Sequence, residues 1–405
     1  MVRAAILWCA YVSRFVDAHG RYQRRGLTAE EAGELLGMSG RHFRRLCIRY
    51  EEEGESGLRD RRVGAVSSRR AAAGEIARMR GLYRDRYHDF TAQHFHEVLR
   101  REHNYKLGYT VTRLALQSAG LMTKAVRRGV HRKKRVRRPL PGMLLFQDGS
   151  THSWLPAAGG GAGGPAGDSE VKQDLIVTMD DATGAIYSIF LVAQEGTDSS
   201  FQGLSDVIRE HGLFSAFYTD RGSHYFFTPK AGGKVDKSQL TQIGRALGQL
   251  GIRHIPSYSP QGRGRMERVF GTLQHRIPQE LRVLGLDTIA AANAYLRDHF
   301  MADYNARFAV TPTEPGSAFV AYQGVALAEV LCVQEDRQVG RDNCVRWHGM
   351  NLQIPAQQHR QHYVKVTVQV RQYGDASLAI FDGPRCLARY DAHGQRPDEP
   401  TRRAA

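Results

Sequence analysis

The sequence predicts a multidomain protein with an N-terminal all-α helix-turn-helix part, a central α/β core and a small C-terminal β-barrel. Three observations support this prediction. Two short helical patterns separated by a glycine begin at Leu27, apolar runs of strand length follow Gly142, and short alternating strands fill the region after Pro315. The 405 residues are also too many for one domain of roughly 150 residues.

Changes in composition divide the chain into six parts. Residues 1–66 hold the first helix-turn-helix, 67–123 a second, helix-turn-helix-like part, 124–141 a basic linker, 142–315 the α/β core, 316–390 the β-barrel and 391–405 a tail. We expect the tail to be disordered because Arg, Pro and Asp dominate it.

The positive charge is concentrated in the N-terminal third. The chain carries 57 Lys and Arg against 41 Asp and Glu, a formal charge of +16. Residues 1–145 hold 31 basic and 14 acidic residues, and the remainder holds 26 and 27. This surplus favours a polyanionic partner, nucleic acid before an acidic membrane surface. The early apolar run from Ala4 to Val12 is shorter than the roughly 20 residues of a spanning helix. We expect a cytoplasmic protein without membrane association.

The linker is the most basic stretch of the chain. Nine basic residues and no acid precede Pro139 and Pro141: Lys124, Arg127, Arg128, Arg132, Lys133, Lys134, Arg135, Arg137 and Arg138. Such a run repels itself and is expected to stay extended until phosphates neutralise it. The alternative is a charge run that only water contacts.

The first helical pair has the signals of a helix-turn-helix. Thr28 and Glu31 are spaced as a capping box, Gly37 ends the first helix, and Ser39 can cap the second. Apolar residues predict the inner faces: Ala32, Leu35 and Leu36 on the first helix, and Phe43, Leu46 and Ile48 on the second. Basic side chains are expected to project outward for contact with DNA: Arg41, His42, Arg44, Arg45 and Arg49. An ordinary helical hairpin is the alternative.

The second helical part is predicted by two periodic stretches, 92–102 and 111–119, joined through a turn glycine in 105–109. Histidines 88, 94, 96 and 103 suggest zinc, but no cysteine pair stands nearby, and the five cysteines of the chain never form C-x-x-C. We expect histidines that pack or face solvent, and reduced thiols.

The core follows a pattern of three strands, a helix over 199–211 and a further strand. A helix between strands predicts a crossover to a parallel neighbour. Asp148 and Asp220 lie near strand ends, and Glu267 lies early on a helix that continues to Ile277. Asp180 and Asp181 are assigned instead to the hairpin turn DDATG.

Acids from two strands and one helix can converge on two Mg²⁺ or Mn²⁺ ions, hard cations that prefer oxygen ligands. Such a pair activates an attacking oxygen and stabilises a leaving oxygen in phosphoryl transfer. Taken singly, each aspartate is more typical of a turn, and Glu267 of a salt bridge.

The motifs QDGSTHSW, TMDDATG, FYTDRGSHY and SPQGRGRMERVFGTLQ, in this order, resemble the integrase core (rve) of DDE transposases and retroviral-type integrases. The DGS-x-H-x-W and TDR forms are similar to insertion-sequence transposases of the ISNCY group. The resemblance covers about residues 27–315 and includes FMADYNARFAVTP. The 46 residues between Asp220 and Glu267, and the Gly-rich loop 157–167, are longer than in many such cores.

The resemblance implies a ribonuclease H-like core in which Asp148, Asp220 and Glu267 hold two Mg²⁺ or Mn²⁺ ions. It implies cleavage at transposon ends and strand transfer into target DNA, with double-stranded terminal inverted repeats as partner, a homodimer or higher oligomer on DNA, and a location at a prokaryotic nucleoid. Further DNA contacts are expected from six residues near the acids: His152, Trp154, Arg221, Arg263, Arg265 and Arg268. His152 and Trp154 could equally well pack at the domain edge. For the four arginines, the alternative is a surface ion pair.

Two other functions stay open: a DNA-binding regulator with an inactive core, and a metal-dependent nuclease without strand transfer. Beyond the core, a helix is expected over 318–333, followed by strands in which Val364, Val366, Val368 and Val370 alternate with polar residues. These strands predict the β-barrel, which the resemblance suggests binds nucleic acid or supports assembly.

Overall fold

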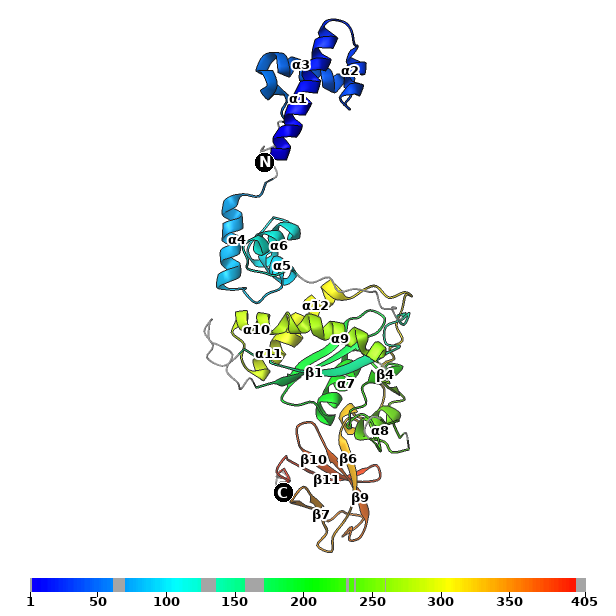
Figure 1. Ribbon diagram of the computed structural model, residues 1–405. Helices are drawn as coiled ribbons and strands as arrows, with labels where there is room; N and C mark the ends of the chain where they lie inside the picture. The colour runs from blue at the N-terminus through cyan, green and yellow to red at the C-terminus, as the bar shows by residue number, and fades with distance from the viewer. Residues whose placement is uncertain are drawn as a thin grey trace. The chain divides into compact units, whose positions relative to one another are not determined.

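The computed structural model describes residues 2–60, 70–124, 136–156, 171–230, 233–236, 238–258 and 260–397, without the side chains of 2–7 and 260–263. The chain divides into two compact units, residues 1–76 and 77–405 (Figure 1).

The first unit is a small helical domain built from α1 (Val2–Gln23), α2 (Ala29–Leu35), α3 (Gly40–Glu53) and the 3₁₀ turn η1 (Gly54–Leu58). The predicted capping box is confirmed, because Thr28 accepts from the Glu31 amide and the Glu31 carboxylate accepts from the Thr28 amide. The predicted Ser39 cap of α3 is also confirmed.

The core of this unit differs from the prediction in two positions. Leu35 is 60% exposed and Ile48 is 55% exposed, whereas Phe43, Leu46 and Cys47 are buried. The reason is the long α1, which the sequence pattern did not reveal. Its residues Val12, Phe15 and Ala18 pack in the same cluster as Phe43, so the inner stripe of α3 follows the helical spacing 43, 46, 47.

Three helices follow, α4 (Ala73–Asp85), α5 (Ala92–Glu102) and α6 (Tyr109–Ser118), and the second unit begins within the first of them. The two predicted helices are confirmed, and α4 is additional. Arg80 of α4 donates to the carbonyl of Ala115 in α6, and Tyr83 packs edge-on against Phe95 of α5. The histidines of this region pack or pair: His96 contacts Thr112 and His103 contacts Tyr87.

Buried ionic contacts join α5 to the helices of the core. His94 lies 2.8 Å from Glu280, with side chains only 1% and 10% exposed. Arg276 binds Glu97 at 2.8 Å, and Arg307 binds the same carboxylate at 3.1 Å. Because an unpaired buried charge is strongly unfavourable, these pairs favour a single docked position of α5 within the unit.

The core is a five-stranded sheet of order β3-β2-β1-β4-β5 (Figure 1). Its strands are β1 (Leu145–His152), β2 (Gln173–Asp180), β3 (Ile186–Val192), β4 (Ala216–Thr219) and β5 (Arg253–Pro256). β1, β2 and β3 are antiparallel neighbours, whereas β1 with β4 and β4 with β5 are parallel. The predicted crossover to a parallel strand is confirmed, and the arrangement fits the expected ribonuclease H-like core.

Helices cover both faces of this sheet. Successive strand residues point to opposite faces, so neighbouring residues of β1 pack against different helices. Leu145 packs in one cluster with α7 (Thr197–His211) and α8 (Gln242–Gln249). Phe146 packs in the other with the second helical layer. That layer comprises α9 (Pro260–Gln274), α10 (Ile277–Leu284), α11 (Ile289–Tyr295), the π-helical turn η2 (Leu296–Phe300) and α12 (Met301–Phe308).

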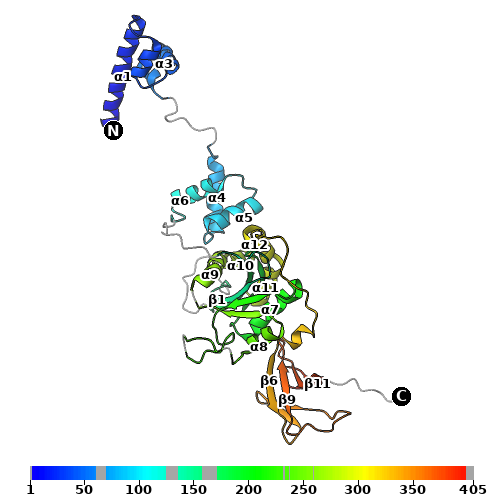
Figure 2. The ribbon, with the colours of Figure 1, turned by 90° about the vertical axis from the view of Figure 1, so that its right-hand side faces the viewer.

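The C-terminal strands form two sheets, and Figure 2 labels β6, β9 and β11 of the larger one. One has the order β11-β10-β9-β6, and the other pairs β7 with β8. The strands are β6 (Val333–Gln338), β7 (Cys344–Trp347), β8 (Met350–Gln353), β9 (Thr367–Gln372), β10 (Leu378–Asp382) and β11 (Arg385–Tyr390).

These strands require two corrections. Within the described residues the barrel does not close, because β7 and β8 pair only with each other. The helix expected over 318–333 is absent from that stretch apart from the turn η3 (Leu327–Glu329), since Val320 forms a bridge with Leu213. The expected alternation is seen at Val368 and Val370, which are buried in the shared core.

None of the helices in the described parts of the chain has the length and apolar character needed to cross a membrane.

Candidate active site

Asp148 and Asp220 hold matching positions on two neighbouring parallel strands. β1 and β4 pair Leu145 with Phe217 and Phe146 with Tyr218. Asp148 lies two residues beyond Phe146, and Asp220, directly after β4, lies two residues beyond Tyr218. Matching steps along parallel strands direct side chains to the same face. Asp148 is only 8% exposed and is therefore buried.

A buried hydrogen-bond network includes Gln147, the residue before Asp148 on β1. The Tyr225 hydroxyl donates to Oε1 of Gln147 at 2.9 Å and accepts from the Ser200 hydroxyl at 3.1 Å. Gln147 in turn donates to Thr178 Oγ1 at 2.9 Å. The network ties β1, β2, α7 and the turn after β4 together, and it fixes the segment that follows Asp220.

The pKa of the buried Tyr225 hydroxyl is raised by its surroundings. Burial raises the pKa of Tyr225 well above its usual range, and the charges of Glu195, Asp220 and Asp148 raise it further against the hydrogen bond from Ser200. Charges interact strongly over short distances in such a buried setting. Asp148 and Asp220 lie on neighbouring segments of the sheet, and their grouping around a metal ion stays a prediction.

Glu267 lies on α9, on the helical layer that covers β1. Its neighbours Met266 and Phe270 are buried in the same cluster as Phe146, and Gln274 donates to the Ser150 hydroxyl of β1 at 3.3 Å. The Glu267 side chain itself is exposed. Within the described residues, no three His, Cys, Asp or Glu side chains form a group that could hold a metal ion. The carboxylate oxygens of Asp148, Asp220 and Glu267 are nevertheless the donor type that suits Mg²⁺ or Mn²⁺.

Glu195 and His224 form a contact close to the motif residues, and the sequence analysis singled out neither of them. His224 Nε2 lies 3.6 Å from Glu195 Oε1, with side chains 18% and 26% exposed. An acid just before a helix is typical of a helix start, and a histidine in a turn has no distinctive pattern. The available sequence signal was the two motif glycines beside them: Gly149 lies against Glu195, and Gly222 lies against His224.

The arginines predicted to bind phosphates are in different surroundings. Arg265 forms an ion pair with the fully buried Asp181 of the β2–β3 turn. Arg268 is exposed and donates to the carbonyl of Gly264. Arg221 donates to the carbonyl of Gly233 at 2.7 Å and lies over the ring of Tyr258. The Arg263 side chain lies outside the described residues.

His152 and Trp154 follow the first acid along β1. Trp154 is fully buried and donates from its indole to the carbonyl of Ser150 at 2.8 Å. The His152 ring packs edge-on against it, with centroids 5.2 Å apart. Trp154 therefore packs in the core, where it offers no surface to DNA.

His254 of β5 lies beside the end of β4. Its Nε2 is 3.0 Å from Thr219 Oγ1, and its ring stacks on Phe226. Burial lowers the pKa of His254 to about 3. This imidazole is therefore uncharged near neutral pH and adds no positive charge beside Asp220.

The predicted DNA-binding residues outside the core are only partly described. On α3, Arg41, His42, Arg44 and Arg45 are exposed, and Arg49 donates to the carbonyl of Arg59. In the linker, Lys124 is exposed, while Arg137 and Arg138 bind the Asp181 residue. The other six linker residues, Arg127, Arg128, Arg132, Lys133, Lys134 and Arg135, lie outside the described residues.

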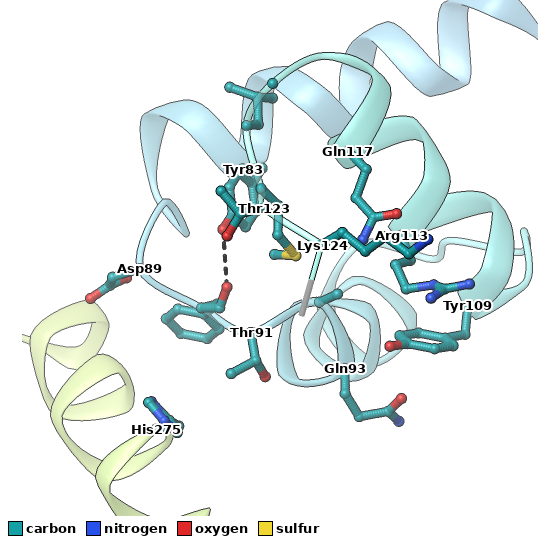
Figure 3. Close-up of a pocket in the computed structure, with 15 residues that line it drawn as sticks. Tyr83, Asp89, Thr91, Gln93, Tyr109, Arg113, Gln117, Thr123, Lys124 and His275 are labelled. Atoms are coloured by element: carbon teal, nitrogen blue, oxygen red, sulfur yellow. Dashed lines mark hydrogen bonds between the residues drawn. The ribbon is translucent and has the colours of Figure 1, made fainter. Parts of the chain in front are cut away.

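A cleft of about 1340 Å³ opens between α5, α6 and the end of α9 (Figure 3). Its wall includes Arg113 and Lys124 together with the amides of Gln93 and Gln117. At its back, Tyr83 donates to the Phe90 carbonyl at 3.0 Å. The acid Asp89 also lines this cleft, so its wall carries charges of both signs.

Comparison with known proteins gives two sequence relatives. The transposase y4bF of Sinorhizobium fredii is 30% identical over 356 residues, which are 87% of this chain and 75% of that protein. The transposase for insertion sequence IS1202 of Streptococcus pneumoniae is 29% identical over 174 residues, 43% of this chain and 34% of that protein. No model of a known protein family matches the chain.

Solved structures give weaker likenesses. The intasome of simian T-cell lymphotropic virus, solved with the PP2A regulatory subunit B56 gamma, matches at TM-score 0.33 and 16% identity, over 73% of this chain and 92% of that chain. The HTLV-2 integrase catalytic core with magnesium matches at TM-score 0.27 and 16% identity, over 40% and 90%. The family assignment rests on the sequence relatives.

Proposed function

Since this chain belongs to the integrase-core transposases, we propose that it cleaves DNA at transposon ends and transfers the freed strands into target DNA by a two-metal DDE mechanism. The observation that carries the proposal is the matched position of Asp148 and Asp220 on adjacent parallel strands. Glu267, on the helix packed over β1, completes the set when its exposed side chain turns toward the sheet.

The chemistry consists of two in-line displacements at phosphorus. Water attacks the strand at the transposon end and releases a 3′ hydroxyl, which then attacks a phosphodiester of the target strand. Two Mg²⁺ or Mn²⁺ ions held by Asp148, Asp220 and Glu267 would activate the attacking oxygen and neutralise charge on the leaving oxygen. No covalent bond to the protein is needed in either step.

The remaining residues bind and position DNA in this proposal. The exposed basic side chains of α3 read the terminal repeats in the major groove, and the basic linker follows the phosphate backbone. Arg221 directly follows Asp220 and Arg268 directly follows Glu267 in the sequence, and both provide cations for phosphates. Since two transposon ends must be joined together, the active form is a dimer or larger assembly on DNA.

The experiment incubates the full chain and Mg²⁺ with labelled duplexes taken from the two ends of the DNA element that encodes it. A plasmid serves as target, and a duplex of scrambled sequence is the matched control. We expect end-specific cleavage and labelled strands joined to the plasmid. Cleavage without joining would indicate a nuclease, and retarded but intact DNA would indicate a regulator; either result would overturn the proposal.

A further inference from the structure

Arg137 stands near the end of the basic linker, but its guanidinium lies on the β2–β3 turn of the core. Nη1 donates to the carbonyl oxygens of Asp181, at 3.0 Å, and of Ala182, at 3.4 Å. A Cβ built at Gly184 would lie 3.2 Å from the same nitrogen. Because residue 184 has no side chain, the guanidinium fits closely against the backbone of the turn.

The backbone that follows Arg137 is held by the same turn. The amide of Arg138 donates to Oδ2 of Asp181 at 2.8 Å, and the amide of Gly142 donates to Oδ1 of Asp180 at 3.0 Å. Both aspartates are fully buried, and a buried carboxylate needs such partners. The last residues of the basic linker are therefore part of the hydrogen-bonded structure of the core.

The turn brings two buried acids together, and arginines from two distant segments supply the opposite charge. Arg265 of α9 forms an ion pair with the Asp181 carboxylate. Burial raises the pKa of Asp180, and the nearby charge of Asp181 adds to this effect. Since buried charges are unfavourable without a partner, the guanidinium of Arg137 beside this turn lowers its electrostatic cost. This cation of the linker is thus directed at the core.

The next residue along the linker has different surroundings. The Arg138 side chain is exposed, and it is the backbone amide of this residue that binds the turn. Of two adjacent linker arginines, one therefore places its guanidinium on the core and the other faces solvent, where a phosphate can reach it.

We propose that Arg137 is a positioning residue, which anchors the core end of the basic linker to the β2–β3 turn and is not itself a phosphate contact. This inference deepens the proposed function, on which its effect on strand joining rests. DNA held by the linker then reaches the core at a fixed point. Without the anchor that point shifts while the phosphate contacts remain, so joining slows and the affinity for DNA does not change.

Hydrogen exchange of the full chain without DNA, measured by mass spectrometry, tests the anchor. We expect Arg137→Ala to speed exchange in the peptide that spans residues 138–142 about 10-fold or more, because a hydrogen-bonded contact of a charged group is lost. Arg138→Ala removes the exposed side chain and keeps the bonded amide, so it is the matched control and should retain the protection. Unchanged exchange in Arg137→Ala would overturn the inference.

Binding and joining of transposon-end duplexes test what the anchor does. Arg137→Ala should leave the salt dependence of binding unchanged, whereas the loss of a phosphate contact lowers its slope by about 0.9. In protein that circular dichroism shows to be folded, the joining rate at saturating DNA should fall about 10-fold or more, at an unchanged half-saturating DNA concentration. A lowered slope would make Arg137 a phosphate contact, and that result would also overturn the inference.

The results distinguish failure of this inference from failure of the proposed function. If the unaltered chain binds the duplexes but joins none, the proposed function fails, and the exchange and salt data still decide whether Arg137 is an anchor. If the unaltered chain joins ends and Arg137→Ala joins them at the same rate, the proposed function stands and the inference is wrong.

Discussion

Asp148 and Asp220 lie the same number of residues beyond a directly paired couple, Phe146 and Tyr218, on adjacent parallel strands. Although 71 residues separate them in the chain, strand pairing places their backbones side by side. This relationship depends on the register of β1 with β4. A slip of one residue would turn one of the two carboxylates to the opposite face of the sheet.

Replacement of Asp220 by Asn is expected to abolish cleavage of transposon-end DNA while leaving the affinity for that DNA nearly unchanged. The amide keeps the size of the side chain but loses the negative charge that a cation requires. Cleavage assays and gel shifts on the same preparation provide both readouts. Asp298→Asn, which alters an exposed acid paired with Arg297, is the control. Near-normal cleavage by Asp220→Asn would remove this residue from the mechanism.

Arg265→Ala and Arg268→Ala are expected to differ in their effect on stability, although the two arginines lie one turn apart on α9. Arg265 neutralises the buried Asp181, so its loss should lower the free energy of unfolding by about 3 kcal/mol or more. Arg268 is exposed, so its loss should change stability by less than about 0.5 kcal/mol and weaken DNA binding. Urea unfolding and gel shifts measure the two effects. Equal stability of the two variants would contradict the structural role of Arg265.

The free energy of unfolding should fall as the pH is lowered from about 7 to 5. In this range His254 takes up a proton in the unfolded chain but not in the folded chain. Its folded pKa of about 3 is below the ordinary value of 6.5, so the unfolded state binds more protons between these values. Between pH 7 and pH 5 this residue should cost on the order of 2 kcal/mol. The same measurement on His254→Phe should lack that contribution. An identical pH dependence in both proteins would show that His254 is charged in the folded state.

Replacement of Lys133, Lys134 and Arg135 by Ala should flatten the salt dependence of DNA binding. Each lost phosphate contact lowers the slope of log K against log salt by about 0.9. Binding measured at several salt concentrations gives the slope for both proteins. Loss of affinity without a change in slope would assign these residues to the alternative, a charge run that only water contacts.

Local signals allowed much of the fold and part of the site to be predicted. The capping box at Thr28, the DDATG turn and the succession of three strands, a helix and a further strand depend on residues close in sequence, and the structure bears them out. Asp148 and Asp220 could be singled out because each comes shortly after a run of apolar residues, although the structure places Asp148 inside β1 and only Asp220 after its strand. The predicted crossover to a parallel strand makes β1 and β4 neighbours.

The remaining features depend on contacts between distant segments. Ile48 was expected to be buried, but α1 selects Phe43 and Cys47 as the inner stripe of α3. A bridge from Val320 to Leu213 replaces the helix expected there. Glu195 has no distinctive sequence pattern. Its position beside β1 depends on the hydrogen bond from its amide to Asp174 and on the absence of a side chain at Gly149. Such pairings cannot be read from neighbours in the chain.

The most direct test of the central claim is anomalous diffraction from crystals of the full chain grown or soaked with Mn²⁺. We predict an anomalous peak at roughly 2.1 Å from carboxylate oxygens of both Asp148 and Asp220. Crystals that contain Mn²⁺ at other sites but show no peak between these two carboxylates, from protein that still joins DNA ends, would contradict the account.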